Sequence, residues 1–269
     1  MKIRRNHFYF LILPILITCL ICYCATTGPG GKKSLILIST SQEVSLGKEF
    51  AAQVDSTNPI SDDSVLVDYV NEIGQKVAGF SDRSALTYRF AVIDTPVVNA
   101  FACPGGYIYL YAGLLNVMEN ESQLAGVLAH EISHVVARHG VKRLQQVLGL
   151  QVLLSIALGE SGELTQQAVG LGLSVLLQAH SRENEFEADE YGTLYMQKAG
   201  YNPEGMVQLL EKLLEMSSGE SGFLEKVMAT HPPTRDRIER VQSQIKGFDP
   251  SVKNLPFNEE EYQKMKKRI

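Results

Sequence analysis

The sequence predicts an α+β fold that is mainly α-helical, with a small antiparallel sheet. The 269 residues are 45% hydrophobic and 20% charged, which provides enough apolar material for one globular core. Apolar residues recur at helical spacing over most of the chain, and a period of two is confined to residues 86–111. The chain contains no internal repeat and no low-complexity tract. These observations exclude a disordered chain and a repeat protein.

Charge and cysteine content exclude two further classes of protein. Asp plus Glu total 30 against 25 for Lys plus Arg, so no basic field indicates nucleic-acid binding. Cys19, Cys22 and Cys24 crowd into the N-terminus and only Cys103 lies in the body, which excludes a small disulfide-stapled fold. A lone thiol such as Cys103 is usually a small buried hydrophobe.

Residues 1–23 have the composition of an export signal. Three basic residues precede an apolar stretch from Phe8 to Ile21, which is shorter than the roughly 20 residues of a spanning helix. A cysteine at the end of this stretch predicts lipoprotein processing at Cys24; Cys19 is the alternative site, and an uncleaved anchor is the alternative to processing. We expect a lipidated or flexible tether over residues 24–39, which attaches the exported chain to a membrane at the periplasmic face of a bacterial envelope.

The body of the chain, residues 40–247, is expected to be a single domain. Its first elements are helices over residues 42–54 and 64–78 and strands over residues 86–93, 97–102 and 107–111. The second helix carries its apolar residues on one stripe. Alternating apolar residues and the turn at Pro104–Gly106 predict the strands, which we expect to form an antiparallel sheet. Residues 248–269 are polar and are expected to form a surface tail.

A helix expected over residues 120–137 carries candidate metal ligands. Asn120 can cap its start. His130 and His134 lie four residues apart, so both imidazoles face one side and can bind one metal ion. Glu131, about 100° from His130 around the helix axis, can reach a water on that metal. Surface histidines are the alternative, but buried ionisable groups in such an apolar helix cost several kcal/mol unless they are paired or bind metal.

A second helix, expected over residues 181–199, supplies candidates to complete the site. A catalytic zinc site usually has three protein ligands and a water, so two imidazoles are not enough. Glu185 and Asp189 lie four residues apart on one face. We assign Glu185 as the third ligand and Asp189 as the carboxylate that accepts the remaining N–H of a ligating histidine. Glu187 is expected to make a surface or structural ion pair, and Gly192 permits close approach to the first helix.

The stretch over residues 144–178 is apolar in two arms, with a break at Gly159–Gly162. Each arm is shorter than the roughly 17 residues at the lower limit for a spanning helix. We expect a helical hairpin that packs on the domain or contacts an oligomer partner, because apolar patches of this size need cover. The next helix, starting at Asn202-Pro203, is expected in the core.

The two motifs resemble those of the forty-eighth metallopeptidase family, the zinc gluzincins that include HtpX, BepA-like proteins and CAAX prenyl proteases. The resemblance rests on His130-Glu131-x-x-His134 and Glu185-x-Glu187-Ala188-Asp189, with support from Asn99–Phe101, Pro104–Gly106 and His231–Thr234, and covers most of the body. It implies a gluzincin-type fold in which the zinc-binding helices pack beside the small sheet. It also implies one zinc ion per chain, bound by His130, His134 and Glu185. Some members have membrane helices between the two motifs, so a hairpin that dips into the membrane is the alternative for residues 144–178.

The resemblance further implies a zinc-dependent endopeptidase of the bacterial cell envelope that cleaves unfolded or misassembled envelope proteins. Glu131 would act as general base toward a zinc-activated water. Protein or peptide substrates are expected to bind as extended strands, either along residues 99–102 or along the strand after Gly106. The alternative is a latent, largely nonproteolytic zinc-binding chaperone or scaffold for envelope protein assembly. A homo-oligomer or an envelope-assembly partner is open, and no nucleic-acid partner is expected.

His231 is a candidate for a further role at the metal. It stands in a Pro-rich loop before a helix that bears Arg237, and loops on rigid scaffolds often carry functional groups. We expect His231 to approach the zinc, either as a fourth ligand that holds the enzyme off or as a donor to the oxyanion, with Arg237 helping in the second role. A loop histidine that faces solvent or caps a helix is the alternative. His139 and His180 are expected to be surface or structural residues.

Overall fold

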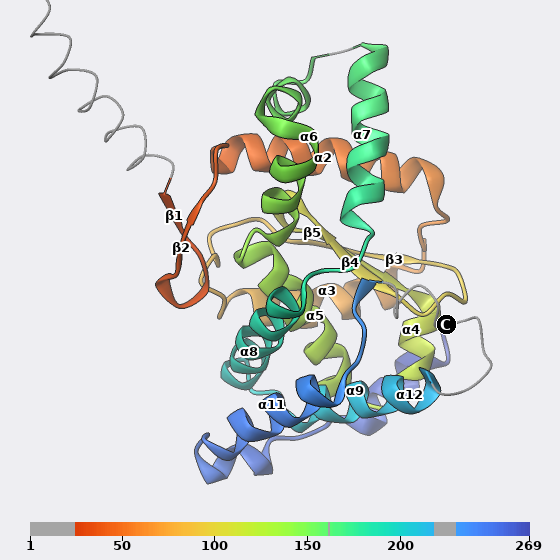
Figure 1. Ribbon diagram of the computed structural model, residues 1–269. Coiled ribbons are helices and arrows are strands. Elements are labelled where there is room, and N and C mark those ends of the chain that lie inside the picture. Colours follow the sequence, from red (N-terminus) through yellow and green to blue (C-terminus); the bar gives the residue numbers. More distant parts are fainter. Residues whose placement is uncertain (1–24, 161, 218–229) are drawn as a thin grey trace, which may run out of the picture.

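The computed structural model describes residues 25–160, 162–217 and 230–269 (Figure 1). The signal peptide expected over residues 1–23 and the lipidation site expected at Cys24 lie outside the described residues. The described part is mainly helical and contains a small sheet. The predicted α+β, mainly α-helical class is therefore confirmed.

Helices make up most of this structure, and polar caps start the two that carry the predicted ligands. The helices are α2 (Thr40–Thr57), α3 (Ser64–Ala78), α4 (Ala112–Val117), α5 (Glu121–Val136), α6 (His139–Ala157), α7 (Glu163–Leu176), α8 (Arg182–Lys198), α9 (Glu204–Ser217), α11 (Arg235–Lys246) and α12 (Glu259–Lys266). The side chain of Asn120 accepts a hydrogen bond from the backbone N–H of Gln123 at the start of α5. Ser181 accepts one from Asn184 at the start of α8. Both caps satisfy backbone donors that a helix start leaves free.

The main sheet contains β3 (Arg89–Ile93), β4 (Ala100–Cys103) and β5 (Tyr107–Tyr111), in the order β3-β5-β4. β4 and β5 form the expected antiparallel hairpin around Pro104–Gly106, but β3 runs parallel to β5. The expectation of an antiparallel sheet is therefore wrong for β3. The chain between β3 and β4, residues 94–99, carries β4 to the far side of β5, so β3 and β4 never pair.

Alternate residues of the sheet pack into two different cores. Ile108 and Leu110 of β5 belong to the core formed with α3 and α5. Tyr109 and Tyr111 belong to the core formed with α2, α6 and α7. Cys103 of β4 is buried in the second core, as expected for a small hydrophobe. The period of two seen in the sequence thus places helices on both faces of the sheet.

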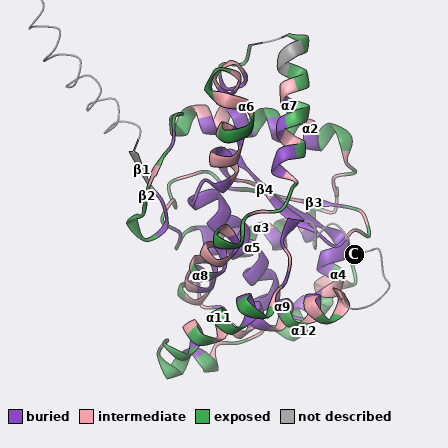
Figure 2. Ribbon diagram, in the orientation of Figure 1, coloured by how far each residue is buried: buried purple, intermediate pink, exposed green. Residues whose placement is uncertain are grey.

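α5 lies between the sheet and helices α8 and α9, and it is buried along its whole length (Figure 2). Small side chains on α8 let the two helices approach closely. A Cβ atom at Gly192 would lie 3.1 Å from the backbone nitrogen of His130, and Ala188, one turn earlier, is fully buried. The face of α8 that the sequence predicts to be thin therefore lies against the part of α5 that carries the histidines.

α6 and α7 form the predicted helical hairpin, which packs on α2 (Figure 1). Leu144 and Ile156 are buried in the core that the hairpin shares with α2. Val147, Leu158 and Leu171 in the same part of the chain are exposed. Over the described ranges, no helix combines the length and apolar character that crossing a membrane requires.

Both ends of the described chain are more closely attached to the domain than the sequence suggests. In the segment expected as a tether, β1 (Ala25–Thr27) and β2 (Lys33–Leu35) pair as an antiparallel hairpin, and Ile36 after it is buried. In the segment expected as a surface tail, Tyr262 of α12 is 2% exposed and its hydroxyl donates to the carbonyl oxygen of Leu115. The average polarity of these segments hides the few apolar side chains that anchor them.

Candidate metal centre

The two predicted ligand motifs meet in the structure. His130 and His134 on α5 face Glu185 on α8, and His231 joins them from the loop before α11. Each of these four residues offers one donor atom, and the four atoms lie within 4.8 Å of one another. All four residues are buried. Such a cluster of buried imidazole and carboxylate groups is costly unless its members are paired or bind a metal.

The spacing of the donor atoms suits a zinc ion. A tetrahedral ion with zinc–nitrogen distances of about 2.0–2.1 Å keeps its donors about 3.3 Å apart. His130 Nε2 lies 3.0 Å from His134 Nε2 and 3.5 Å from Glu185 Oε2. His134 Nε2 lies 3.4 Å from Glu185 Oε1. Two imidazoles and one carboxylate are also a ligand set that catalytic zinc sites use. The residues present therefore fit the zinc ion that the sequence predicts.

His231 lies inside the site. Its Nδ1 is 3.0 Å from Glu185 Oε1, and its Nε2 is 3.7 Å from Glu131 Oε1. The loop is held there by the preceding residue, since Thr230 Oγ1 donates to Oδ1 of Asn99, the residue before β4. His231 is 8% exposed, which excludes the alternative of a solvent-facing loop histidine.

Asp189 contacts His130 and is itself held by Arg237. His130 Nδ1 lies 2.9 Å from Asp189 Oδ1, the contact expected of a carboxylate that accepts the ring N–H of a ligand. Arg237 donates from Nε and Nη2 to the two oxygens of Asp189, over 2.7 and 2.8 Å. Its Nη1 lies 2.9 Å from Glu185 Oε2 and donates to the carbonyl oxygen of Pro232. This geometry favours a clamp on two carboxylates over the oxyanion role considered for Arg237 from the sequence.

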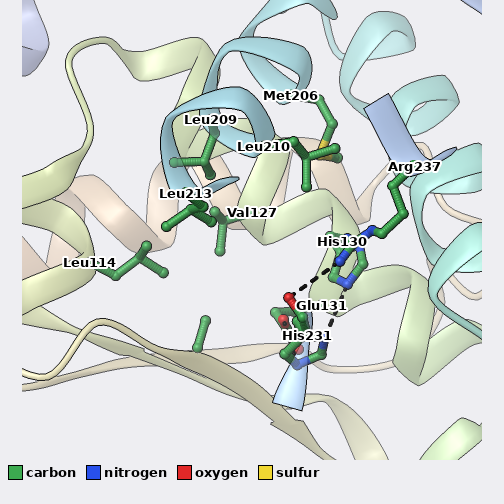
Figure 3. A pocket seen from close by; sticks show the side chains of 11 residues that line it. Leu114, Val127, His130, Glu131, Met206, Leu209, Leu210, Leu213, His231 and Arg237 are labelled. Carbon is green, nitrogen blue, oxygen red and sulfur yellow. Dashed lines mark hydrogen bonds and ion pairs between the residues drawn. The ribbon is translucent and has the colours of Figure 1, made fainter. Parts of the chain in front are cut away.

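Glu131 lies at the end of an apolar pocket (Figure 3). Its side chain is almost fully buried and shares the polar end of the pocket with His130 and His231. The pocket encloses about 450 Å³, part of it open to solvent, and Ala100 at the start of β4 borders it. Its apolar wall consists of Leu114, Val127, Met206, Leu209, Leu210 and Leu213. An apolar side chain can therefore be bound directly beside Glu131.

Only one of the two strands considered for substrate binding lies at an edge of the sheet. β5, the strand after Gly106, lies between β3 and β4 and is paired on both sides. That alternative is therefore wrong. β4 pairs with β5 alone among the strands of the described chain, so its second edge offers backbone groups to an extended peptide.

The buried carboxylates determine the protonation of His130. Burial disfavours the charged imidazolium, but the hydrogen bonds to Asp189 and Glu185 outweigh burial and raise the pKa of His130 to about 10. Burial also disfavours a charge on Asp189, yet the Arg237 guanidinium lowers the pKa of that carboxyl. His130 thus holds a proton, between two ionised carboxylates, that a metal ion has to displace.

Zinc binding at pH 7 is therefore expected to release about one proton, because a histidine must lose its proton to become a ligand. Since His130 stays protonated below its pKa of about 10, the apparent zinc affinity should rise with pH by up to about tenfold per unit and level off above that value. Calorimetry in buffers of different ionisation enthalpy measures the number of protons released. A binding enthalpy that is the same in all buffers at pH 7 would contradict the prediction.

The sequence did not predict that His139 and His180 contact His134. The sequence left open whether His139 is a surface or a structural residue. It is 1% exposed, so it is not a surface residue. Its Nδ1 lies 2.9 Å from His134 Nδ1, and its Nε2 lies 2.9 Å from Glu187 Oε2. Glu187 also pairs with Lys32, so it makes ion pairs as expected. The ring of His180 packs on that of His134 with 4.1 Å between centroids. The sequence shows His139 five residues after His134, but residues at this spacing do not share a face of a helix, so it did not indicate the contact.

The sequence of the chain is similar to those of known proteases. The model of the family described as Peptidase family M48 matches residues 66–245. The chain is 30% identical over 226 residues to the Beta-barrel assembly-enhancing protease of Escherichia coli (strain K12), an alignment that covers 80% of this chain and 46% of the relative. It is 32% identical over 177 residues to the Mitochondrial metalloendopeptidase OMA1 of Schizosaccharomyces pombe, covering 65% of this chain and 51% of the relative. It is 24% identical over 217 residues to the Metalloprotease YcaL of Escherichia coli, covering 77% and 82%. The chain thus spans about half the length of the first two relatives.

Proposed function

Because the chain belongs to peptidase family M48, we propose that it is a zinc metalloendopeptidase of the bacterial cell envelope that cleaves unfolded or misassembled envelope proteins. The match to the family model confirms the resemblance seen in the two motifs. The observation that carries the proposal is the buried cluster of His130, His134 and Glu185, with the carboxylate of Glu131 beside it. The names of two relatives, a metalloendopeptidase and a metalloprotease, support the activity. The name of the β-barrel assembly-enhancing protease supports the envelope setting.

The reaction assigns a separate task to each residue of the site. When bound by His130, His134 and Glu185, zinc supplies a Lewis acid to the substrate carbonyl and to the attacking water. A carboxylate oxygen of Glu131 takes a proton from that water as its oxygen bonds to the carbonyl carbon. The same carboxyl then gives the proton to the leaving nitrogen as the C–N bond breaks. Asp189 orients the ring of His130 through its Nδ1 atom.

The surroundings of Glu131 support binding of an extended polypeptide. The second edge of β4, which pairs with no strand of the described residues, can pair with substrate backbone, and this gives affinity without selecting a sequence. The apolar pocket beside Ala100 can take one apolar side chain of the bound segment. Folded proteins bury such side chains, whereas unfolded segments expose them together with unpaired backbone groups. Unfolded proteins therefore fit this site best.

The envelope location and the membrane attachment are part of this proposal. They rest on the basic and apolar composition of residues 1–23 and on Cys24, all outside the described residues. The exported chain would then be attached to the membrane through a lipid on Cys24, with Cys19 as the alternative site.

Removal of the metal tests the proposed activity. The full chain is expected to cleave an unfolded casein, to lose this activity with a zinc chelator and to regain it when zinc is added back, because ligands and reaction both require the ion. Metal content is measured on the same samples. A chain that binds zinc but cuts no unfolded protein, even with His231 removed, would favour the latent chaperone or scaffold instead.

One observation favours a latent form of the enzyme. His231 offers a donor atom within 4.8 Å of those of the three expected ligands, so it could take the fourth position, where a catalytic site keeps its water. His231→Ala is therefore expected to raise the rate of casein cleavage with little change in zinc content, since three ligands remain. Steady-state rates and zinc content of the two proteins check this. A lower rate with zinc retained would instead support the role of His231 as a donor to the oxyanion.

A further inference from the structure

The two imidazoles of α5 are each contacted on the side away from the metal cluster. His130 Nδ1 faces the carboxylate of Asp189. His134 Nδ1 instead lies 2.9 Å from Nδ1 of His139, which in turn faces Glu187 through Nε2. Lys32 of the N-terminal hairpin ends this row, with its Nζ 3.0 Å from Glu187 Oε1.

The contacts of Glu187 with Lys32 and His139 determine which atom donates in each of these hydrogen bonds. A carboxylate that pairs with the ammonium of Lys32 only accepts hydrogen bonds, so His139 Nε2 must donate to Glu187. A neutral imidazole that donates from Nε2 accepts at Nδ1, so the proton between the two rings belongs to His134 Nδ1. His134 Nε2 is then left with its lone pair, directed at His130 and Glu185.

An unusual backbone turn brings His139 to this position. In a continuous helix, a residue five positions after His134 would point about 140° away from it. α5 ends at Val136, and Arg138 adopts a left-handed conformation with φ 55°, which is uncommon for a residue with a side chain. Two contacts hold Arg138 there, an ion pair of Nε with Glu43 and a hydrogen bond of Nη2 to Thr40. The turn folds the start of α6 back so that His139 covers the Nδ1 side of His134.

We propose that His139, held by Glu187, is a positioning residue that fixes the tautomer and ring orientation of His134 before zinc binds. Glu187 lies between Glu185 and Asp189 on α8, so this one helix would supply a zinc ligand, the outer contact of His130 and the carboxylate that holds His139. Outer contacts of this kind typically change metal affinity or activity by 10–100-fold. The inference rests on the proposed role of His134 as a zinc ligand.

Three variants of the full chain test His139 through zinc affinity, measured by competition with a chromogenic chelator. His139→Leu keeps the bulk of the side chain but removes the acceptor, and it should weaken zinc binding by about 10–100-fold. His139→Asn places Oδ1 near the site of Nδ1 and should restore most of the affinity. Lys33→Ala is the control, because Lys33 is an exposed residue of β2 next to Lys32 and takes no part in these hydrogen bonds. Zinc binding by His139→Leu equal to that of the wild type would overturn the proposal, as would an Asn variant no better than the Leu variant.

The tautomer of His134 gives a second readout that needs no variant to fold. Long-range ¹H–¹⁵N correlation spectra of the zinc-free wild type, labelled at histidine, distinguish a proton on Nδ1 from one on Nε2. A proton on Nδ1 is expected, and one on Nε2 would overturn the proposal. Neither readout depends on proteolysis. A wild type that binds no zinc contradicts the proposed function, whereas a wild type and a Leu variant that bind zinc equally contradict only the role of His139.

Discussion

Replacing Glu131 with glutamine is expected to lower kcat for cleavage of an unfolded protein by about 10²–10⁴-fold while zinc stays bound. The amide has the shape of the carboxylate but cannot take a proton from water. Glu131 is not among the residues whose donor atoms cluster around the metal position, so its loss leaves the ligands in place. Its side chain is almost fully buried at the polar end of the pocket, so bulk water is a poor substitute as base.

The measurement pairs the cleavage rate with zinc content on the same samples. Glu190→Gln is the matched control, since Glu190 is an exposed residue of α8 next to Asp189 and should leave the rate unchanged. A Glu131→Gln variant that cleaves at the wild-type rate would show that another group removes the proton. A variant that loses its zinc would show that Glu131 holds the metal, and the general-base role would need another test.

Local spacing explains why the central part of the site could be predicted from the sequence. His130 and His134 share a helical face whenever residues 120–137 form a helix, and an apolar stripe with a good N-cap makes that helix highly favoured. The same spacing places Glu185 and Asp189 on one face of α8. These faces of α5 and α8 can approach closely because Gly192 and Ala188 are small residues, which the sequence also shows.

Contacts that depend on tertiary structure could not be predicted in the same way. The order of the sheet is decided by how residues 94–99 cross its end, so spacing alone could not show that β4 and not β5 lies at the edge. His139 touches His134 only because Arg138 adopts a left-handed conformation, which the sequence does not encode in any spacing. The partners of Arg237 were also hidden, because Asp189 and Glu185 lie on a helix far away in the sequence.

Replacing Arg237 with methionine is expected to lower the free energy of unfolding of the zinc-free protein by about 3–5 kcal/mol, because it leaves buried carboxylates without their partner. Arg237 is 3% exposed and binds both oxygens of Asp189 as well as Glu185. The free energy of unfolding of Arg237→Lys should lie between those of the wild type and Arg237→Met. An ammonium keeps the charge but cannot donate to both oxygens of Asp189 in the way that a guanidinium does. Denaturant unfolding of the three proteins measures the loss. A variant with wild-type stability but a much lower kcat would instead support a direct role in binding the oxyanion.

The pH dependence of this loss separates an electrostatic clamp from simple packing. Burial disfavours the charge on Asp189, but Arg237 more than compensates and lowers the pKa of the carboxyl. A carboxyl with a depressed pKa contributes stability above its unfolded value, about 3.9, and this stability disappears as the pH falls through the folded pKa. Without Arg237 the burial that remains favours protonated Asp189. The difference in free energy of unfolding between wild type and Arg237→Met should therefore be widest near neutral pH. It should begin to shrink above the ordinary carboxyl pKa of about 3.9, where the variant already protonates Asp189, and go on shrinking until the wild type protonates it too. A gap that stays constant down to pH 3 would mean that the methionine variant loses packing rather than a charge partner.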